Sequence, residues 1–176
     1  MSPQRYIDEE SESHGDIVQQ AYMDTHRTLT TKSLAMLRWV SRYCSNAKYV
    51  IKLDDDIRFD TSTFLQTVER ATGGRERAIL GQVISRPTKV VRDARSRYFV
   101  SEREFAAAMF PPYVLGGLVA FPAATARLLY EASLRVKVIQ LDEVYVTGLL
   151  AAAVNVSLVS DPEFTFQHHS CGAIRV

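Results

Sequence analysis

The sequence predicts an α/β domain, because runs with the character of buried strands alternate with runs that have the period of amphipathic helices. The chain has 176 residues, of which 47% are hydrophobic, so residues 1–176 suit one domain with its own core. Three consecutive carboxylates, at residues 54–56, follow the apolar run 48–53. Ligands bind at the carboxyl ends of strands in open α/β sheets, so these carboxylates mark the expected functional edge.

Helices are predicted where apolar residues recur every three or four positions. The polar start, residues 1–11, lacks this period and is expected to be a loop. Threonine, serine and proline favour helix starts, and glycine favours helix ends. The predicted helices are Thr28–Tyr43, a segment from Thr61 or Ser62 to Gly73, a segment after Pro122 that buries Leu128, Leu129 and Ala132, and a segment from Asp142 to Ala153.

Strands are predicted in the short apolar runs between these helices. Gly116 and Gly117 lie inside one run, where glycine lets a ligand or another backbone come close. Residues 86–103 are basic and loop-like, and form either a solvated surface or a rim that holds an anionic ligand. The predicted strands are Lys48–Leu53, Ala78–Ile84, Tyr98–Val100, Tyr113–Phe121 and Val156–Val159.

Composition excludes several classes of protein. The net charge of +1 rests on 21 basic and 20 acidic side chains, so no global field recruits nucleic acid or an acidic membrane. No apolar run approaches the length of a membrane span. Two distant cysteines, Cys44 and Cys171, exclude a CxxC site but neither require nor exclude one bridge. Phosphate-loop, dinucleotide, zincin and GxSxG motifs are absent.

The triad Asp54, Asp55 and Asp56 has two interpretations. Aspartates are common in strand-to-helix turns, where they bond to the backbone. Clustered carboxylates at a ligand-binding edge also suit a hard divalent cation such as Mg²⁺ or Mn²⁺. The second interpretation predicts a metal-assisted transferase.

Two later pairs are equally open. Asp142 and Glu143 either cap a helix start or provide a general base, and one residue can cap while the other reacts. His168 and His169 are either exposed loop residues or ligands for Mn²⁺.

Six segments, in one order, together resemble the β-1,3-galactosyltransferase-like hexosyltransferases, which are related to Fringe-type enzymes. Residues 12–32 are similar to the family's GDI and Y-x-NLTLKT stretch, and 37–39 with 44–56 to its LKW and C-P-x-A-K-Y-V-x-K-x-DDD. Residues 98–101 are similar to W-Y-V-S, 110–117 to YPPY and G-x-G, and 141–148 to EDVYVTG. The resemblance covers nearly the whole chain.

The resemblance implies a GT-A fold, which is a Rossmann-like mixed sheet flanked by helices. It implies an inverting, Mn²⁺-dependent transfer of galactose or N-acetylglucosamine from UDP-galactose or UDP-N-acetylglucosamine to a glycan on a glycoprotein or glycolipid. Asp56 and Asp54 would hold the metal, with His168 or His169 as a further ligand. Asp54, Asp55, Gly116, Gly117 and Lys32 would contact the donor.

The chain departs from the family pattern in two ways. Glu143 stands at the family's catalytic aspartate and Asp142 at its glutamate, so either is the base or activity is lost. The family's membrane anchor, stem and first nucleotide-binding unit have no counterpart before Glu10. We therefore expect a GT-A domain without its first βα unit, from a longer Golgi membrane protein.

Two other functions are weighed beside the transferase. The first is a catalytically inactive GT-A module that binds or scaffolds, which the Asp142 and Glu143 exchange and the missing unit favour. The second is a metal-dependent phosphohydrolase, which the absence of a phosphate-binding loop disfavours.

Overall fold

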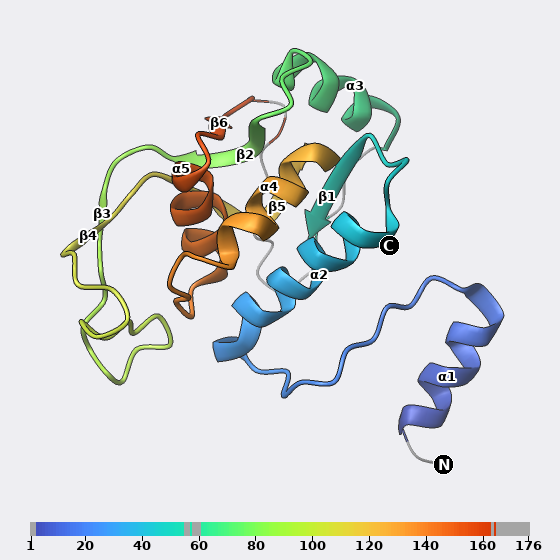
Figure 1. Cartoon of the computed structure of the whole chain (residues 1–176), viewed down its shortest axis with the longest axis horizontal. Helices are drawn as coiled ribbons and strands as arrows, with labels where there is room; N and C mark the ends of the chain where they lie inside the picture. Colours follow the sequence, from blue (N-terminus) through green and yellow to red (C-terminus); the bar gives the residue numbers. More distant parts are fainter. Residues whose placement is uncertain (1–2, 55–56, 58–60, 163, 165–176) are drawn as a thin grey trace, which may run out of the picture.

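The chain folds around a four-stranded mixed sheet, seen in the computed structural model in Figure 1, which describes residues 3–54, 57, 61–162 and 164. The strand order is β1 (Tyr49–Leu53), β5 (Tyr113–Pro122), β2 (Ala78–Ile84) and β6 (Ser157–Val159). β5 is antiparallel to β1 and β2, and β6 is parallel to β2. Two short strands, β3 (Thr88–Lys89) and β4 (Met109–Phe110), form a separate antiparallel pair.

Helices cover both faces of the sheet, as the α/β prediction requires. On one face lie α2 (Leu29–Tyr43), α4 (Ala123–Ser133) and a helical segment that begins at Asp142 and includes the π-helical η2 (Val144–Leu150) and α5 (Ala151–Ala153). On the other face lies α3 (Thr61–Thr72). This mixed sheet between helices confirms the predicted fold class and is compatible with a GT-A-like domain.

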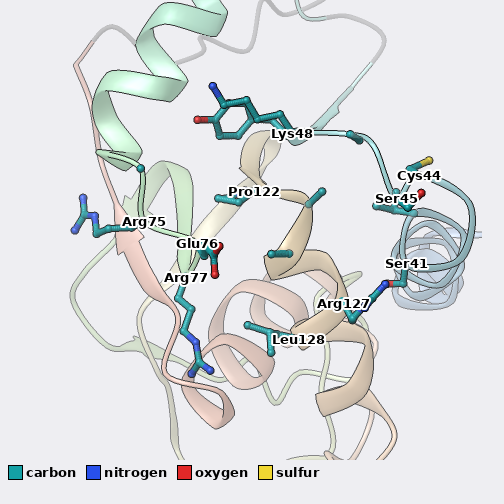
Figure 2. A pocket seen from close by; sticks show the side chains of 16 residues that line it. Ser41, Cys44, Ser45, Lys48, Arg75, Glu76, Arg77, Pro122, Arg127 and Leu128 are labelled. Carbon is teal, nitrogen blue, oxygen red and sulfur yellow. The ribbon is translucent and has the colours of Figure 1, made fainter.

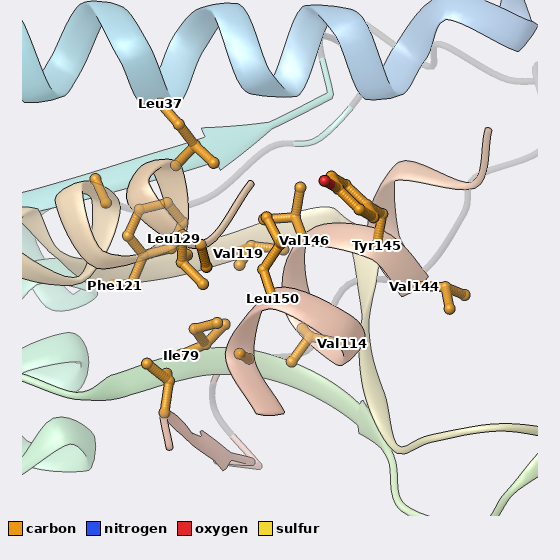
Figure 3. Close-up of a cluster of buried hydrophobic side chains, with 14 of the residues drawn as sticks. Leu37, Ile79, Val114, Val119, Phe121, Leu129, Val144, Tyr145, Val146 and Leu150 are labelled. Carbon is orange, nitrogen blue, oxygen red and sulfur yellow. The ribbon is translucent and has the colours of Figure 1, made fainter. Parts of the chain in front are cut away.

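Alternation along the strands divides the core into two clusters. Val50, Ile79 and Phe121 point to the larger cluster under α2, α4 and η2, which Figure 3 shows. Their neighbours Leu80 and Ala120 point to the smaller cluster under α3. The middle of the sheet is therefore covered on both faces, which explains why most residues of its strands are apolar.

β5 contains an irregularity that later shapes the site. Gly81 pairs with Val119 and Val83 with Val114, so Gln82 alone faces residues 115–118 of β5. Bulges of this kind bend a strand and turn its backbone toward a new direction. The bulge holds Gly116 and Gly117, the two glycines that the sequence singled out.

The structure corrects two predictions of local structure. The described part of the predicted loop 1–11 is helical, because α1 (Pro3–His14) includes residues 3–11. This helix buries no residue and stands apart from the body in Figure 1. It therefore needs no apolar face, and its sequence lacks the apolar period on which the prediction relied. It is supported by pairs four residues apart, from Arg5 to Glu9 at 2.9 Å and from Gln4 to Asp8 at 2.7 Å.

The predicted strand Tyr98–Val100 does not form. The Arg92 guanidinium donates hydrogen bonds to the carbonyl oxygens of Val100, Phe105 and Ala107, at 2.7, 2.7 and 2.9 Å. Within residues 98–100, Arg92 thus binds the Val100 carbonyl, and the Phe99 N–H donates to the Ser96 carbonyl at 3.1 Å, which is a local turn and not a ladder between strands. The other predicted strands and helices are confirmed, with bounds shifted by one or a few residues.

No helix in the described part of the chain is both long and apolar enough to cross a membrane.

Gly81→Ala is expected to destabilise the fold. An added Cβ would lie 2.3 Å from Val114 Cγ1 and 3.0 Å from Leu118 O, so the sheet and core must shift, at a cost of about 1–3 kcal/mol. Urea unfolding measures this. The double variant Gly81→Ala with Val114→Ala removes the closest clashing atom and should lose less stability than the two single variants summed. A loss of stability in the double variant equal to the sum of the two single losses would contradict the clash.

Candidate active site

The carboxyl end of β1 forms one wall of the candidate site. β1 ends at Leu53, and the Asp54 N–H then donates to the Gly117 carbonyl at 3.0 Å, which continues the pairing with β5. The Ile57 N–H donates to the Asp54 carbonyl at 3.2 Å, so the chain turns at once. Asp54 is exposed at this edge. Asp55 and Asp56 lie outside the described residues.

Gly116, in the β5 bulge, forms the floor between β1 and the helical segment that begins at Asp142. A Cβ added to it would lie 3.3 Å from Glu143 Oε2 and 3.7 Å from Lys52 Nζ. The absence of a side chain therefore lets an acidic and a basic side chain reach the same stretch of backbone.

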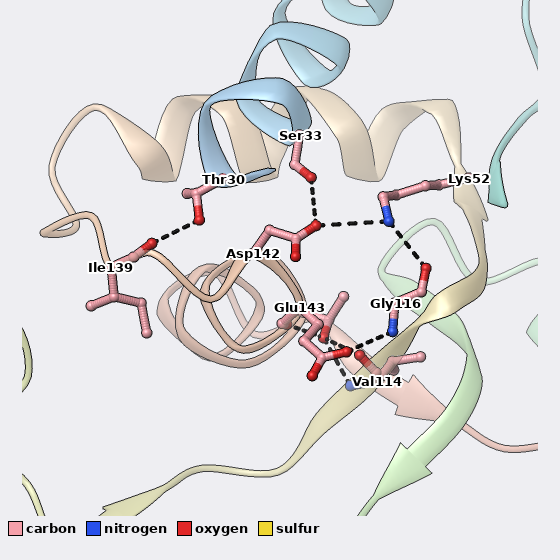
Figure 4. A network of polar contacts seen from close by, with 9 residues as sticks. Thr30, Ser33, Lys52, Val114, Gly116, Ile139, Asp142 and Glu143 are labelled. Atoms are coloured by element: carbon pink, nitrogen blue, oxygen red, sulfur yellow. Dashed lines mark hydrogen bonds and ion pairs between the residues drawn. The ribbon is translucent and has the colours of Figure 1, made fainter. Parts of the chain in front are cut away.

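Asp142 is held by two partners, which Figure 4 shows. The Ser33 hydroxyl of α2 donates to Asp142 Oδ2 at 2.8 Å, and Lys52 Nζ lies 3.7 Å from the same oxygen. Lys52 Nζ also donates to the Gly116 carbonyl at 3.0 Å. The Lys52 and Asp142 side chains are 29% and 15% exposed, so this ion pair is less screened by solvent than a surface pair.

Glu143 lies against the backbone of the bulge. Its Oε2 accepts a hydrogen bond from the Gly116 N–H at 2.8 Å. Burial raises the pKa of the Glu143 carboxyl above its usual value, and the charges of Asp142 and Asp54 raise it further. The Gly116 N–H and the Lys52 ammonium act in the opposite direction, and they do not outweigh the burial.

The π-helical turns of η2 fix the backbone that carries Glu143. The Thr147 hydroxyl donates to the Glu143 carbonyl at 2.6 Å and accepts a hydrogen bond from the Val114 N–H at 2.8 Å. Gly148 lets this helix approach the start of β5, because a Cβ there would lie 3.3 Å from Tyr113 Cβ. Single π-helical turns inside helices are frequent at functional sites.

The two carboxylates have different surroundings and suit different tasks. The Asp142 carboxylate is held by the Ser33 hydroxyl and the Lys52 ammonium group, which suits an anion that keeps its charge and its position. Glu143 accepts one hydrogen bond among the described residues and has a raised pKa, which brings a carboxylate closer to the range useful for a general base. Neighbouring acids whose environments differ in this way are typical of acid–base sites.

The structure brings together part of the predicted site. Asp142, Glu143 and Gly116 form one network, and the Gly117 carbonyl binds the Asp54 backbone beside it. Lys32 is not in this network, since its ammonium group pairs with Asp24 at 3.3 Å on the surface. Its role in donor binding stays a prediction.

The predicted metal ligands are mostly not described. Asp55, Asp56, His168 and His169 lie outside the described residues, and within residues 3–54, 57, 61–162 and 164 no three His, Cys, Asp or Glu residues form a group that could hold a metal ion. Cys44 has no disulfide partner among the described residues, and Cys171, with which the sequence left a bridge open, lies outside them.

Sequence reasoning missed Ser33, Lys52 and Thr147. Ser33 stands among the apolar positions of its helix, and Lys52 interrupts an apolar strand. A polar residue at a position that the pattern buries needs a partner, so both were detectable as candidates. That both pair with Asp142 was not detectable, because Asp142 lies 109 residues from Ser33 in the chain.

Comparison with known proteins gives a consistent result. A sequence model of the Galactosyltransferase family matches residues 2–162. Beta-1,3-galactosyltransferase 1 of Homo sapiens and that of Mus musculus are each 33% identical to the chain over 141 residues, which is 80% of this chain and 43% of each relative. Beta-1,3-galactosyltransferase 5 of Homo sapiens is 29% identical over 152 residues, 86% of this chain and 48% of that protein. The chain thus spans less than half the length of these relatives.

Glu143→Gln is expected to change how stability depends on pH. Because folding raises the Glu143 pKa, the folded protein binds this proton more tightly than the unfolded chain does. The resulting stability is full below the unfolded-state pKa and is lost as the pH rises through the folded-state pKa. The variant lacks this loss and should be more stable than the wild type at neutral pH.

Urea unfolding between pH 4 and pH 8 tests this expectation. Glu131→Gln, at an exposed position of α4, is the matched control and should run parallel to the wild type. A constant difference between Glu143→Gln and the wild type over the whole range would contradict the raised pKa.

Proposed function

The chain belongs to the galactosyltransferase family, and from this premise we propose that it transfers galactose or N-acetylglucosamine from the corresponding UDP-sugar to a sugar hydroxyl. The acceptor is a glycan on a glycoprotein or glycolipid, the new bond is a β-1,3 linkage, and the anomeric configuration is inverted. The reaction is metal-assisted.

One observation carries this proposal. Glu143, a half-buried carboxylate with a raised pKa, lies against Gly116 at the same edge where β1 delivers Asp54. Asp54 is close enough for its charge to raise the Glu143 pKa. A base for the acceptor therefore lies next to the residues proposed for the donor, as an inverting transfer requires.

Glu143 acts as the base in this proposal. An acceptor hydroxyl gives its proton to the Glu143 carboxylate while its oxygen attacks the anomeric carbon from the face opposite the diphosphate. The bond from the anomeric carbon to the diphosphate oxygen breaks, and UDP leaves with the electron pair. Asp142 positions the segment through Ser33 and Lys52 and does not take the proton.

A divalent cation fits the residues proposed for it. Asp56 and Asp54, with His168 or His169, would supply carboxylate and imidazole ligands, a set that suits Mn²⁺. Asp54 is the one among them that the structure describes, and it is exposed at the carboxyl end of β1. When bound, the cation would offset the charge that develops on the departing diphosphate. Asp55, Gly117 and Lys32 are proposed to contact the donor.

The family resemblance also supports a place of action. We propose the lumenal side of the Golgi membrane. Fluorescence of the tagged full-length protein with a Golgi marker tests this.

A second candidate is a module that keeps the fold but does not catalyse. The exchange of acid lengths at residues 142 and 143 favours it, because a shift of about 1 Å in a reacting group can cost about a hundredfold in rate. It predicts binding of a nucleotide or glycan without turnover.

UDP release decides between the two functions. The chain is incubated with UDP-galactose or UDP-N-acetylglucosamine, Mn²⁺ and benzyl glycosides of N-acetylglucosamine, N-acetylgalactosamine and galactose as acceptors. We expect release that depends on acceptor, and a loss on the order of 10²–10⁴ in Glu143→Gln, as for removal of a general base. Glu131→Gln is the control. A larger loss in Asp142→Asn would move the base to Asp142, and no release in any mixture would favour the inactive module.

UDP binding tests the metal site separately. Calorimetry should show binding with Mn²⁺ that EDTA abolishes and that Asp56→Ala weakens by about tenfold or more, since one charged ligand is lost. Asp16→Ala, in the polar linker after α1, is the control. Equal binding with and without Mn²⁺ would contradict the proposed metal role.

A further inference from the structure

A second cleft lies at the opposite end of the sheet from the candidate active site. Tyr49, where β1 begins, and Pro122, where β5 ends, both line it. These two residues pair at one end of the β1–β5 ladder, and Leu53 and Leu118 pair at the other end, beside the candidate active site. Its volume of about 690 Å³ is within the range of small-molecule sites, about 300–1,000 Å³. Nothing in the proposed transfer reaction uses this cleft.

Four cationic side chains line the cleft, and three of them lack a carboxylate partner among the described residues. Lys48 pairs with Glu69 at 2.5 Å. Arg75 and Arg77 donate to backbone carbonyls, those of Thr72 at 2.8 Å and Val154 at 3.1 Å, so their charges are not neutralised. Arg127 makes no hydrogen bond or ion pair in the described part of the chain. Positive charge therefore exceeds negative charge around the cleft.

The cleft also holds one carboxylate, Glu76. Figure 2 shows Glu76 on one side, in the segment before β2, and Arg127 on the other, extending from α4 toward Ser41 of α2. A bare inorganic anion would be repelled by Glu76. A ligand with an anionic group at one end and hydroxyl groups at the other meets both charges favourably, because a carboxylate accepts hydrogen bonds from hydroxyls.

The remaining lining suits the body of a sugar. Pro122, Ala123 and Leu128 give an apolar floor, and the Tyr49 ring borders it. The Ser41 hydroxyl donates to the Leu37 carbonyl at 2.7 Å, which leaves its oxygen lone pairs to accept hydrogen bonds.

We propose that this cleft binds a sugar that carries a phosphate or sulfate ester. The ester group lies with the guanidinium group of Arg127, and sugar hydroxyls donate to Glu76 on the other side of the cleft. The proposal is independent of the transfer reaction, because it involves neither Glu143 nor the residues proposed for the donor.

Calorimetric titration of the full chain, with EDTA and without any nucleotide, tests the proposal. The probes are galactose 6-phosphate, galactose 6-sulfate, galactose, inorganic phosphate and inorganic sulfate, so the two ester types are distinguished. We expect at least one ester to bind at millimolar or lower concentration. Galactose and the inorganic anions should bind at least about tenfold more weakly than that ester, since each lacks one of the two charged contacts.

Arg127→Met should weaken ester binding by about tenfold, as expected for loss of a charge-assisted contact. Arg38→Met, on an exposed position of α2 outside the cleft, removes the same charge and should leave binding unchanged. If Arg127→Met alters the thermal unfolding midpoint, Arg127→Gln replaces it, with the same expectation.

Glu76→Ala gives a second signature. This variant removes the repulsion between the Glu76 carboxylate and a bound anion, so inorganic phosphate should bind more tightly. The preference for the ester over inorganic phosphate should fall about fivefold or more, because the acceptor for the sugar hydroxyls is lost. Three results would overturn the proposal: no ester binding below about 10 mM, equal losses in Arg127→Met and Arg38→Met, or ester binding that Asp142→Asn abolishes.

Discussion

The candidate site depends on the main chain of one residue, Gly116. Its N–H binds Glu143 at 2.8 Å and its carbonyl binds Lys52 at 3.0 Å, so the two polar groups of one glycine join the helical segment after Asp142 to strand β1. Two conditions make this possible. The bulge opposite Gln82 frees this stretch of β5 from its partner strand β2, and the missing side chain leaves room for both neighbours. Since β1 also delivers Asp54, the geometry of the whole edge follows from this contact.

The network is balanced so that one acid is stabilised and the other is not. Removing a carboxylate from water is costly unless hydrogen bonds and an opposite charge replace the water. Asp142 has both, from Ser33 and Lys52. Within the described part of the chain, Glu143 accepts one hydrogen bond, from the Gly116 N–H; burial outweighs it, so the Glu143 pKa is raised. A fold selected for stability alone would gain by making position 143 neutral, which is why a charged residue there favours a functional role.

The sequence was sufficient for the main elements but not for the polar contacts that define the site. Strands such as Ala78–Ile84 and helices such as Leu29–Tyr43 follow from local apolar patterns, which the sheet and its covering helices then use. The apolar pattern did not predict α1 because this helix is supported by polar pairs between side chains four residues apart. The strand expected at residues 98–100 is replaced by a local turn, in which Phe99 N–H binds the Ser96 carbonyl and Arg92 binds the Val100 carbonyl. Ser33 and Lys52 were visible as misplaced polar residues. Their common target was not, because side-chain pairing across distant segments depends on how the elements pack, and no local pattern encodes it.

The exchanged lengths of the two acids are compatible with an intact site. The shorter side chain, Asp142, is the one that meets Ser33 and Lys52, which approach it from α2 and β1. The longer side chain, Glu143, folds back onto Gly116. A Cβ at position 116 would lie 3.3 Å from Glu143 Oε2, so the glycine leaves the space that this side chain occupies. The extra methylene is therefore taken up against the strand, so the exchange need not move the reactive oxygen by the full length of that group. The exchange in length and the glycine in the bulge together favour Glu143, and not Asp142, as the residue that accepts the proton.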